Sequence, residues 1–104
     1  MGSETTTIQY QRRGGSGTLR LAGVMDIFDA GALRDAAQKA LADEKAKTLR
    51  VDFADVERLD LSAAQILMAL RRETLEAKRA FQWENAPEQV TQILAWLGMT
   101  SEKQ

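Results

Sequence analysis

The chain has 104 residues, of which 44% are hydrophobic and 28% charged, and its formal net charge is −1. A chain of this length fits one globular domain, and its balanced charge provides no basic surface for nucleic acid. Because cysteine and histidine are both absent, disulfides, thiolate catalysis and the commonest metal ligands and general bases are excluded.

The chain opens with a predicted β-hairpin. Residues 6–11 are rich in β-forming side chains, residues 12–17 are dense in glycine, and residues 18–22 alternate apolar and polar side chains. The glycine segment lacks the lysine and the strand-to-helix context of a phosphate-binding loop, so we interpret it as the hairpin turn.

A first helix is predicted after Gly23, reaching about Asp43. Asp26 and Asp29 offer capping carboxylates at its start. Apolar residues recur on one face, at Leu33, Ala37, Ala40 and Leu41. The small side chains on this face permit close approach to a sheet, and residues 48–53 are predicted as a buried strand.

A second helix is predicted from Ser62 onward. Its apolar positions follow helical spacing, at Ala63, Ile66, Leu67, Leu70, Thr74 and Ala77. Met68 and Leu75, with Ala64, form a second apolar strip, which we interpret either as a docking patch or as added breadth of the core.

A short strand and a third helix complete the predicted elements. The strand covers residues 80–84, and Asn85 with Glu88 resembles a capping box for the helix that follows. Its core stripe is Val90, Ile93, Leu94 and Leu97. Gly98 is expected to end the helix, and Trp83 and Trp96 are expected in or at the edge of the core.

This order of elements predicts an α/β fold with a mixed four-stranded sheet. An N-terminal hairpin opens the sheet, two right-handed βαβ crossovers extend it, and about three helices accompany it. No repeat or linker divides the chain, so we expect a single domain over residues 4–99 and a frayed C-terminal tail over residues 100–104.

Ser62 is the leading candidate for a functional residue, because it places a hydroxyl where a strand-to-helix loop meets a helix N-terminus. An oxygen or an added phosphate is favoured there by backbone N–H groups and the helix dipole. Phosphorylation would add roughly −1.5 to −2 charges, which Asp60 and Asp26 would repel and which would act on any surface docked there. The alternative is that Ser62 only caps the helix, with Asp60 as a competing cap.

Enzymatic and metal-binding functions have little support in the sequence. A nucleophilic Ser62 would need a lysine or carboxylate base, and none has telling spacing, so we expect no catalysis. Asp52, Asp55 and Asp60 could bind a hard cation, or simply keep the protein soluble. No apolar run approaches the roughly 20 residues of a membrane helix, and no signal-peptide pattern is present, so we expect a cytoplasmic protein without membrane insertion or cofactors.

Several segments together resemble a STAS domain, a family best known for anti-sigma factor antagonists. The resemblance runs from about residue 6 to residue 99 and rests on the order of elements. It also rests on residues 23–26 (Gly-Val-Met-Asp), 51–53 (Val-Asp-Phe), 59–63 (Leu-Asp-Leu-Ser-Ala), 85–87 (Asn-Ala-Pro) and 97–99 (Leu-Gly-Met). In that family the loop before the second helix reads Asp, two hydroxyl residues and Gly, and a partner kinase phosphorylates the second hydroxyl. Asp60 and Ser62 match this pattern, whereas Leu61 and Ala63 depart from it.

The resemblance implies a non-enzymatic protein-interaction module of bacterial signalling. In the family's scheme, the unphosphorylated form binds an anti-sigma factor kinase and phosphorylation releases it. The implied partner surface comprises Asp26, Asp60, Leu61, Ser62, Ala63, Gln65 and Met68. Similar domains also act as accessory subunits of ABC transporter ATPases in phospholipid transport, or as chemotaxis-associated adaptors, without a phospho-switch. The sequence does not indicate an oligomeric state, and it neither supports nor excludes a bound lipid or nucleotide.

Overall fold

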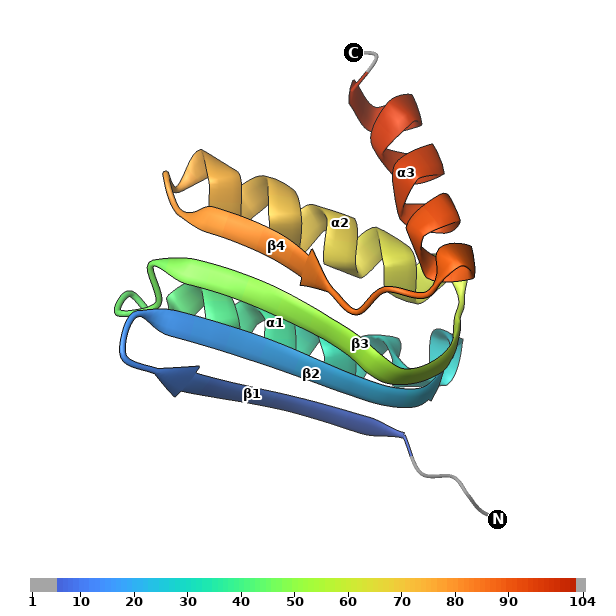
Figure 1. Cartoon of the computed structure of the whole chain (residues 1–104), viewed down its shortest axis with the longest axis horizontal. Helices are drawn as coiled ribbons and strands as arrows, with labels where there is room; N and C mark the ends of the chain where they lie inside the picture. The colour runs from blue at the N-terminus through green and yellow to red at the C-terminus, as the bar shows by residue number, and fades with distance from the viewer. Residues whose placement is uncertain (1–5, 103–104) are drawn as a thin grey trace.

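The computed structural model describes residues 6–102, with side chains described for residues 6–98. The elements in chain order are β1 (Thr7–Arg13), β2 (Ser16–Met25), the short 3₁₀ helix η1 (Ile27–Asp29), α1 (Ala30–Ala42), β3 (Thr48–Leu59), α2 (Leu61–Glu76), β4 (Ala80–Glu84) and α3 (Glu88–Glu102). Figure 1 shows α1 and α2 behind the sheet and α3 beside one end of it, so that one sheet face carries no helix.

The four strands form one mixed sheet in the order β1-β2-β3-β4. β1 and β2 pair antiparallel, whereas β2 with β3 and β3 with β4 pair parallel. This arrangement confirms the predicted hairpin and crossover connections. The core lies between the sheet and the helices. It includes Leu19, Leu21, Met25, Leu33, Leu49, Val51, Phe53, Leu67, Leu70, Val90 and Leu94.

Two glycines shape the hairpin. Gly14 has φ +57° in the two-residue turn between β1 and β2, a backbone conformation that side chains disfavour. Gly17 lies beneath the ring of Tyr10, and a Cβ added there would collide with the ring. The glycine-dense segment therefore serves a tight turn and a close packing contact.

β3 extends six residues beyond the predicted strand, and its pairing with β2 contains two irregularities. The register shifts between Arg20 and Ala22 and again between Gly23 and Val24. Each shift lets β3 contribute an extra residue, as in a β-bulge. The buried positions therefore change from every second residue to every third, at Phe53, Val56 and Leu59.

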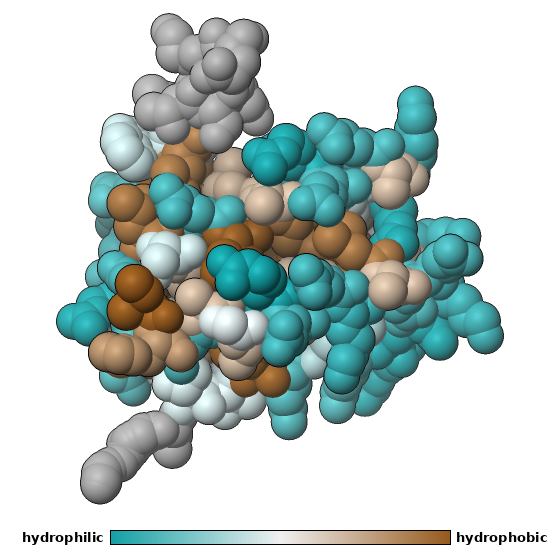
Figure 2. Space-filling view, turned by 180° about the vertical axis from the view of Figure 1, so that it is seen from behind, coloured by the Kyte–Doolittle hydropathy of each residue, from teal (hydrophilic) through white to brown (hydrophobic). Residues whose placement is uncertain are grey.

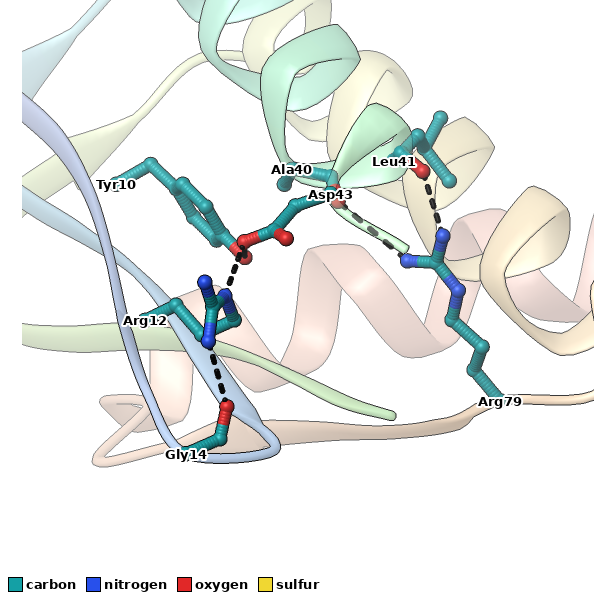
Figure 3. Close-up of polar contacts among 7 residues, drawn as sticks. All are labelled: Tyr10, Arg12, Gly14, Ala40, Leu41, Asp43 and Arg79. Carbon is teal, nitrogen blue, oxygen red and sulfur yellow. Dashed lines mark hydrogen bonds and ion pairs between the residues drawn. The ribbon is translucent and has the colours of Figure 1, made fainter. Parts of the chain in front are cut away.

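Polar contacts join the hairpin to the end of α1 (Figure 3). The Tyr10 hydroxyl and the Arg12 Nε both donate to Asp43 Oδ2, at 2.9 and 2.8 Å. Burial, followed by the Asp43 hydrogen bond, raises the pKa of Tyr10 to about 12. Burial alone would raise the pKa of Asp43, but hydrogen bonds from Tyr10 and Arg12 outweigh it, and the net shift is downward.

Arg79 makes the equivalent connection from β4. It lies at the entrance to that strand, and its Nη2 donates to the Leu41 carbonyl oxygen at 2.6 Å (Figure 3). Carbonyls in the last turn of a helix have no intrahelical partner, so this cation satisfies one of them and complements the helix dipole.

The structure corrects three predictions at the C-terminal end. Gly98 does not end α3, which continues to Glu102, and residues 103–104 of the expected tail lie outside the described residues. Asn85 is not at the N-cap position required for a capping box, because α3 begins at Glu88 and the Pro87 carbonyl oxygen accepts from the Thr91 N–H; the Asn85 amide Nδ2 instead donates to Asp52 Oδ1 at 3.0 Å. Trp96 is not in the core, since 54% of it is exposed, whereas Trp83 is half-buried as expected.

Candidate docking surface

Ser62 lies in the first turn of α2, whose N-cap residue is Asp60. The Asp60 side chain makes no capping hydrogen bond, and instead its Oδ2 accepts a hydrogen bond from Ser62 Oγ at 3.2 Å. The interpretation of Ser62 as a helix cap is therefore wrong, because its hydroxyl bonds a neighbouring side chain and not the helix backbone.

Two loops meet at this helix terminus. The backbone N–H of Asp60 donates to the carbonyl oxygen of Met25 at 2.8 Å, which holds the β3–α2 loop against the end of β2. Asp26 follows Met25 directly and caps η1. Its Oδ1 accepts from the Phe28 N–H at 2.9 Å, and Asp29 Oδ2 accepts from the Asp26 N–H at 3.0 Å. The carboxylate of Asp26 therefore holds the turn that stands beside Ser62.

That turn exposes large apolar side chains. Phe28 is 91% exposed and Ile27 64%, and Leu61, in the first turn of α2, is 41% exposed. We call these three residues the η1 patch. Ile27 and Phe28 are not among the residues predicted for the partner surface, although the sequence contains a signal for them: two adjacent large apolar residues lie outside the periodic stripe of the helix that follows.

A groove of about 630 Å³ runs from the η1 patch between α1 and α2. Ile27 and Ser62 both line it, as do Gln65 and the oppositely charged side chains of Arg34 and Glu73. In Figure 2 an apolar band lies between two hydrophilic ridges on this face of the molecule. The groove thus offers an apolar floor with a polar rim, as protein interfaces commonly do.

The structure separates the seven residues of the predicted partner surface. Ser62 and Gln65 share the α1–α2 groove, whereas Ala63 is fully buried. Met68 lines a different groove, of about 540 Å³, between α2, β4 and α3. The second apolar strip predicted on α2, which comprises Ala64, Met68 and Leu75, is not one surface either, because Ala64 is completely buried and Leu75 is 43% exposed.

Asp52, Asp55 and Asp60, which the sequence offered as ligands for a cation, do not form a cluster in the structure. Within the described part of the chain, no three acidic side chains form a group that could hold a metal ion. Asp52 is buried and accepts hydrogen bonds from Asn85 and from the Ala54 N–H, at 3.0 and 2.9 Å. The Asn85 bond is the main cause that lowers the pKa of Asp52, against the opposing effect of burial. None of the described helices is long and apolar enough to cross a membrane.

Comparison with known proteins finds one matching family model and several solved structures of similar fold. Residues 8–101 match a family model described as Mlab, STAS domain, whereas no curated protein matches the sequence. An anti-sigma factor antagonist from Mycobacterium paratuberculosis is similar with 26% identity and a TM-score of 0.75, over 92% of this chain and 82% of that chain.

Two solved forms of SpoIIAA show the same fold. Its unphosphorylated form, described as an anti-sigma factor antagonist, is 15% identical with a TM-score of 0.74, over 86% of this chain and 83% of that chain. The phosphorylated form, described as a Bacillus cell fate determinant, is 16% identical with a TM-score of 0.74, over 91% and 86%.

Proposed function

The chain belongs to the STAS family, and from this premise we propose that it is a non-enzymatic protein-interaction module of bacterial signalling. It acts in the cytoplasm as an anti-sigma factor antagonist does, and it binds an anti-sigma factor kinase through the η1 patch and the Ser62 loop. The observation that carries this proposal is the 91% exposure of Phe28 beside the N-terminus of α2. A large aromatic side chain left in water is a natural anchor for a protein partner.

Phosphorylation of Ser62 is the switch in this proposal. The first intrahelical hydrogen bond of α2 runs from the Ala64 N–H to the Asp60 carbonyl oxygen, at 2.9 Å. The preceding N–H groups therefore have no acceptor within the helix, and the Asp60 side chain does not cap them. These groups and the helix dipole would accommodate a phosphate on Ser62, so the domain itself would stay folded.

A phosphate on Ser62 would weaken the binding of a partner and would not destabilise the domain itself. Its charge of roughly −1.5 to −2 would stand next to Asp60 and at the border of the η1 patch. A partner that covers the apolar patch would have to desolvate this charge, which is unfavourable unless a cation pairs with it. Phosphorylation would thereby release the partner, as the family's scheme implies.

The two departures from the family pattern have different consequences. Ala63 is buried in the regular part of α2, and positive φ values outside glycine occur in the described residues only at Lys78 and Asn85, so no glycine is required there. Leu61, in place of a hydroxyl residue, is 41% exposed and enlarges the η1 patch. The first departure leaves the loop intact, and the second adds apolar contact area.

A second candidate function has its own support. Leu61 stands where the family pattern has a hydroxyl residue, and its apolar side chain is 41% exposed. These observations favour an accessory subunit of an ABC transporter ATPase that uses the η1 patch as a permanent contact. In that case Ser62 is not phosphorylated, and the same residues serve a constitutive adaptor, as they would in a chemotaxis-type complex.

Capture of partners from bacterial cytosol tests the proposed surface. The immobilised wild-type domain is compared with Phe28→Ala and with the control Gln82→Glu, an exposed change on β4. We expect Phe28→Ala to lose the partner and Gln82→Glu to retain it, with mass spectrometry identifying a kinase or a transporter ATPase. Equal recovery by all three proteins would show that the η1 patch is not the docking surface.

A further inference from the structure

The sheet face without helices contains a polar hollow of about 380 Å³. That face of the sheet is turned toward the viewer in Figure 1, on the side opposite α1 and α2. Three arginines line it, Arg13, Arg20 and Arg50, together with two glutamines, Ser16 and Thr18. None of the described lining residues is a carboxylate. We call this hollow the arginine pocket.

Strand register explains why three arginines converge. Thr18 pairs with Arg50 on β3, and Arg20 lies two residues further along β2, on the same face as Thr18. Paired residues on adjacent strands are about 5 Å apart, and alternate residues on one strand about 7 Å apart. Arg13 approaches from β1, where it pairs with Ser16. The three guanidinium groups therefore come from three neighbouring strands around Thr18.

The arginines retain hydrogen-bonding capacity. Arg20 Nε lies 3.5 Å from Asp52 Oδ2, and Arg50 Nε lies 3.5 Å from Glu84 Oε2. Both distances exceed the 2.7–2.9 Å typical of a strong charged hydrogen bond. The Arg50 Nε is buried and has no hydrogen-bond partner among the described residues. In the part of the chain with described side chains, Arg13 has no ion pair.

We propose that the arginine pocket binds a small phosphorylated anion with two or more negative charges. Planar guanidinium groups bind phosphate oxygens in pairs, and the hydroxyls of Ser16 and Thr18 can donate to the remaining oxygens. The volume lies at the small end of ligand sites, which suits a pyrophosphate unit or a phosphorylated headgroup. The pocket lies on the open face of the sheet, whereas the groove that Ile27 and Ser62 line lies between α1 and α2 on the other face, so the anion and a protein partner can bind together.

Titration with pyrophosphate, followed by backbone amide NMR, tests the site. We expect saturable shifts at Thr18, Arg20 and Arg50, weakening as salt concentration rises. Arg13→Gln and Arg20→Gln should each weaken binding by about tenfold, as loss of a charged hydrogen bond predicts. Arg72→Gln, an exposed change of the same charge on α2, is the matched control and should leave binding unchanged.

Vesicles of phosphatidylcholine with and without phosphatidic acid distinguish a soluble ligand from a lipid headgroup. Binding of pyrophosphate without binding of phosphatidic acid vesicles assigns the pocket to a soluble phosphorylated compound. If the domain binds phosphatidic acid vesicles and Arg13→Gln abolishes this binding, the ligand of the pocket is a lipid headgroup. The proposal is overturned if neither probe binds, if the shifts map to another surface, or if Arg72→Gln weakens binding as much as the pocket variants do.

Discussion

The hydrogen bond between Asn85 and Asp52 fixes the start of the β4–α3 connection, and replacing Asn85 by alanine should destabilise the fold. Asn85 has φ 56°, a left-handed conformation that costs an alanine about 1 kcal/mol. The lost bond to the carboxylate, 3.0 Å long, contributes about 1–2 kcal/mol, because Asn85 itself is exposed. We therefore expect Asn85→Ala to lower the free energy of unfolding by about 2–3 kcal/mol.

The effect of this substitution should depend on pH. The Asn85 hydrogen bond is the main cause that lowers the pKa of folded Asp52 below its ordinary value of 3.8. Ionised Asp52 therefore stabilises the fold at pH values above 3.8, and this contribution is lost as the pH falls through 3.8 toward the folded pKa. The difference between wild type and Asn85→Ala should be largest near neutral pH and should shrink in acid.

Urea unfolding followed by circular dichroism measures both effects. For a domain of this size, 2 kcal/mol corresponds to a shift of about 1–2 M in the midpoint. Asn85→Gly is the matched control, because glycine accepts the left-handed conformation and only the side-chain bond is lost. A difference between wild type and Asn85→Ala that stays constant from pH 7 to pH 3 would refute the role of Asp52.

Three further outcomes are expected at neutral pH. Phe28→Ala should change the free energy of unfolding by less than about 0.5 kcal/mol, because Phe28 is 91% exposed, and should weaken partner binding about 30-fold. A loss of stability as large as the loss of binding free energy would place Phe28 in the core. Ser62→Ala should also cost less than about 0.5 kcal/mol in thermal unfolding, where a helix cap would cost about 1 kcal/mol. Arg79→Ala should lower the free energy of unfolding by about 1–2 kcal/mol, because the Leu41 carbonyl oxygen loses its donor. Urea unfolding curves identical to those of wild type would show that this contact does not stabilise the fold.

The elements that follow a simple period were predictable from sequence. Alternation at Leu49, Val51 and Phe53 identified β3, and helical spacing at Val90 and Leu94 identified α3. The second half of β3 was not predictable in this way, because two register shifts change its buried spacing from two residues to three. Such shifts depend on the neighbouring strand, which a local pattern does not contain.

The site was predictable only in part, for a similar reason. The sequence placed Ser62 at the start of a helix, but which group its hydroxyl contacts depends on the rotamer of Asp60. Gly98 fits a helix end by composition, yet it lies inside α3 against Met68, where a small residue lets two helices approach. Phe28 lies outside the periodic stripe of α1, which marks it as a non-core residue, but its 91% exposure depends on the tertiary structure around η1.

The most direct test of the proposed switch is quantitative partner capture from bacterial cytosol by wild type, Ser62→Ala and Ser62→Asp. We expect wild type and Ser62→Ala to recover the same ATP-dependent kinase in equal amounts and Ser62→Asp to recover almost none. Equal recovery of a transporter ATPase or another signalling protein by all three would contradict the switch and leave a constitutive adaptor.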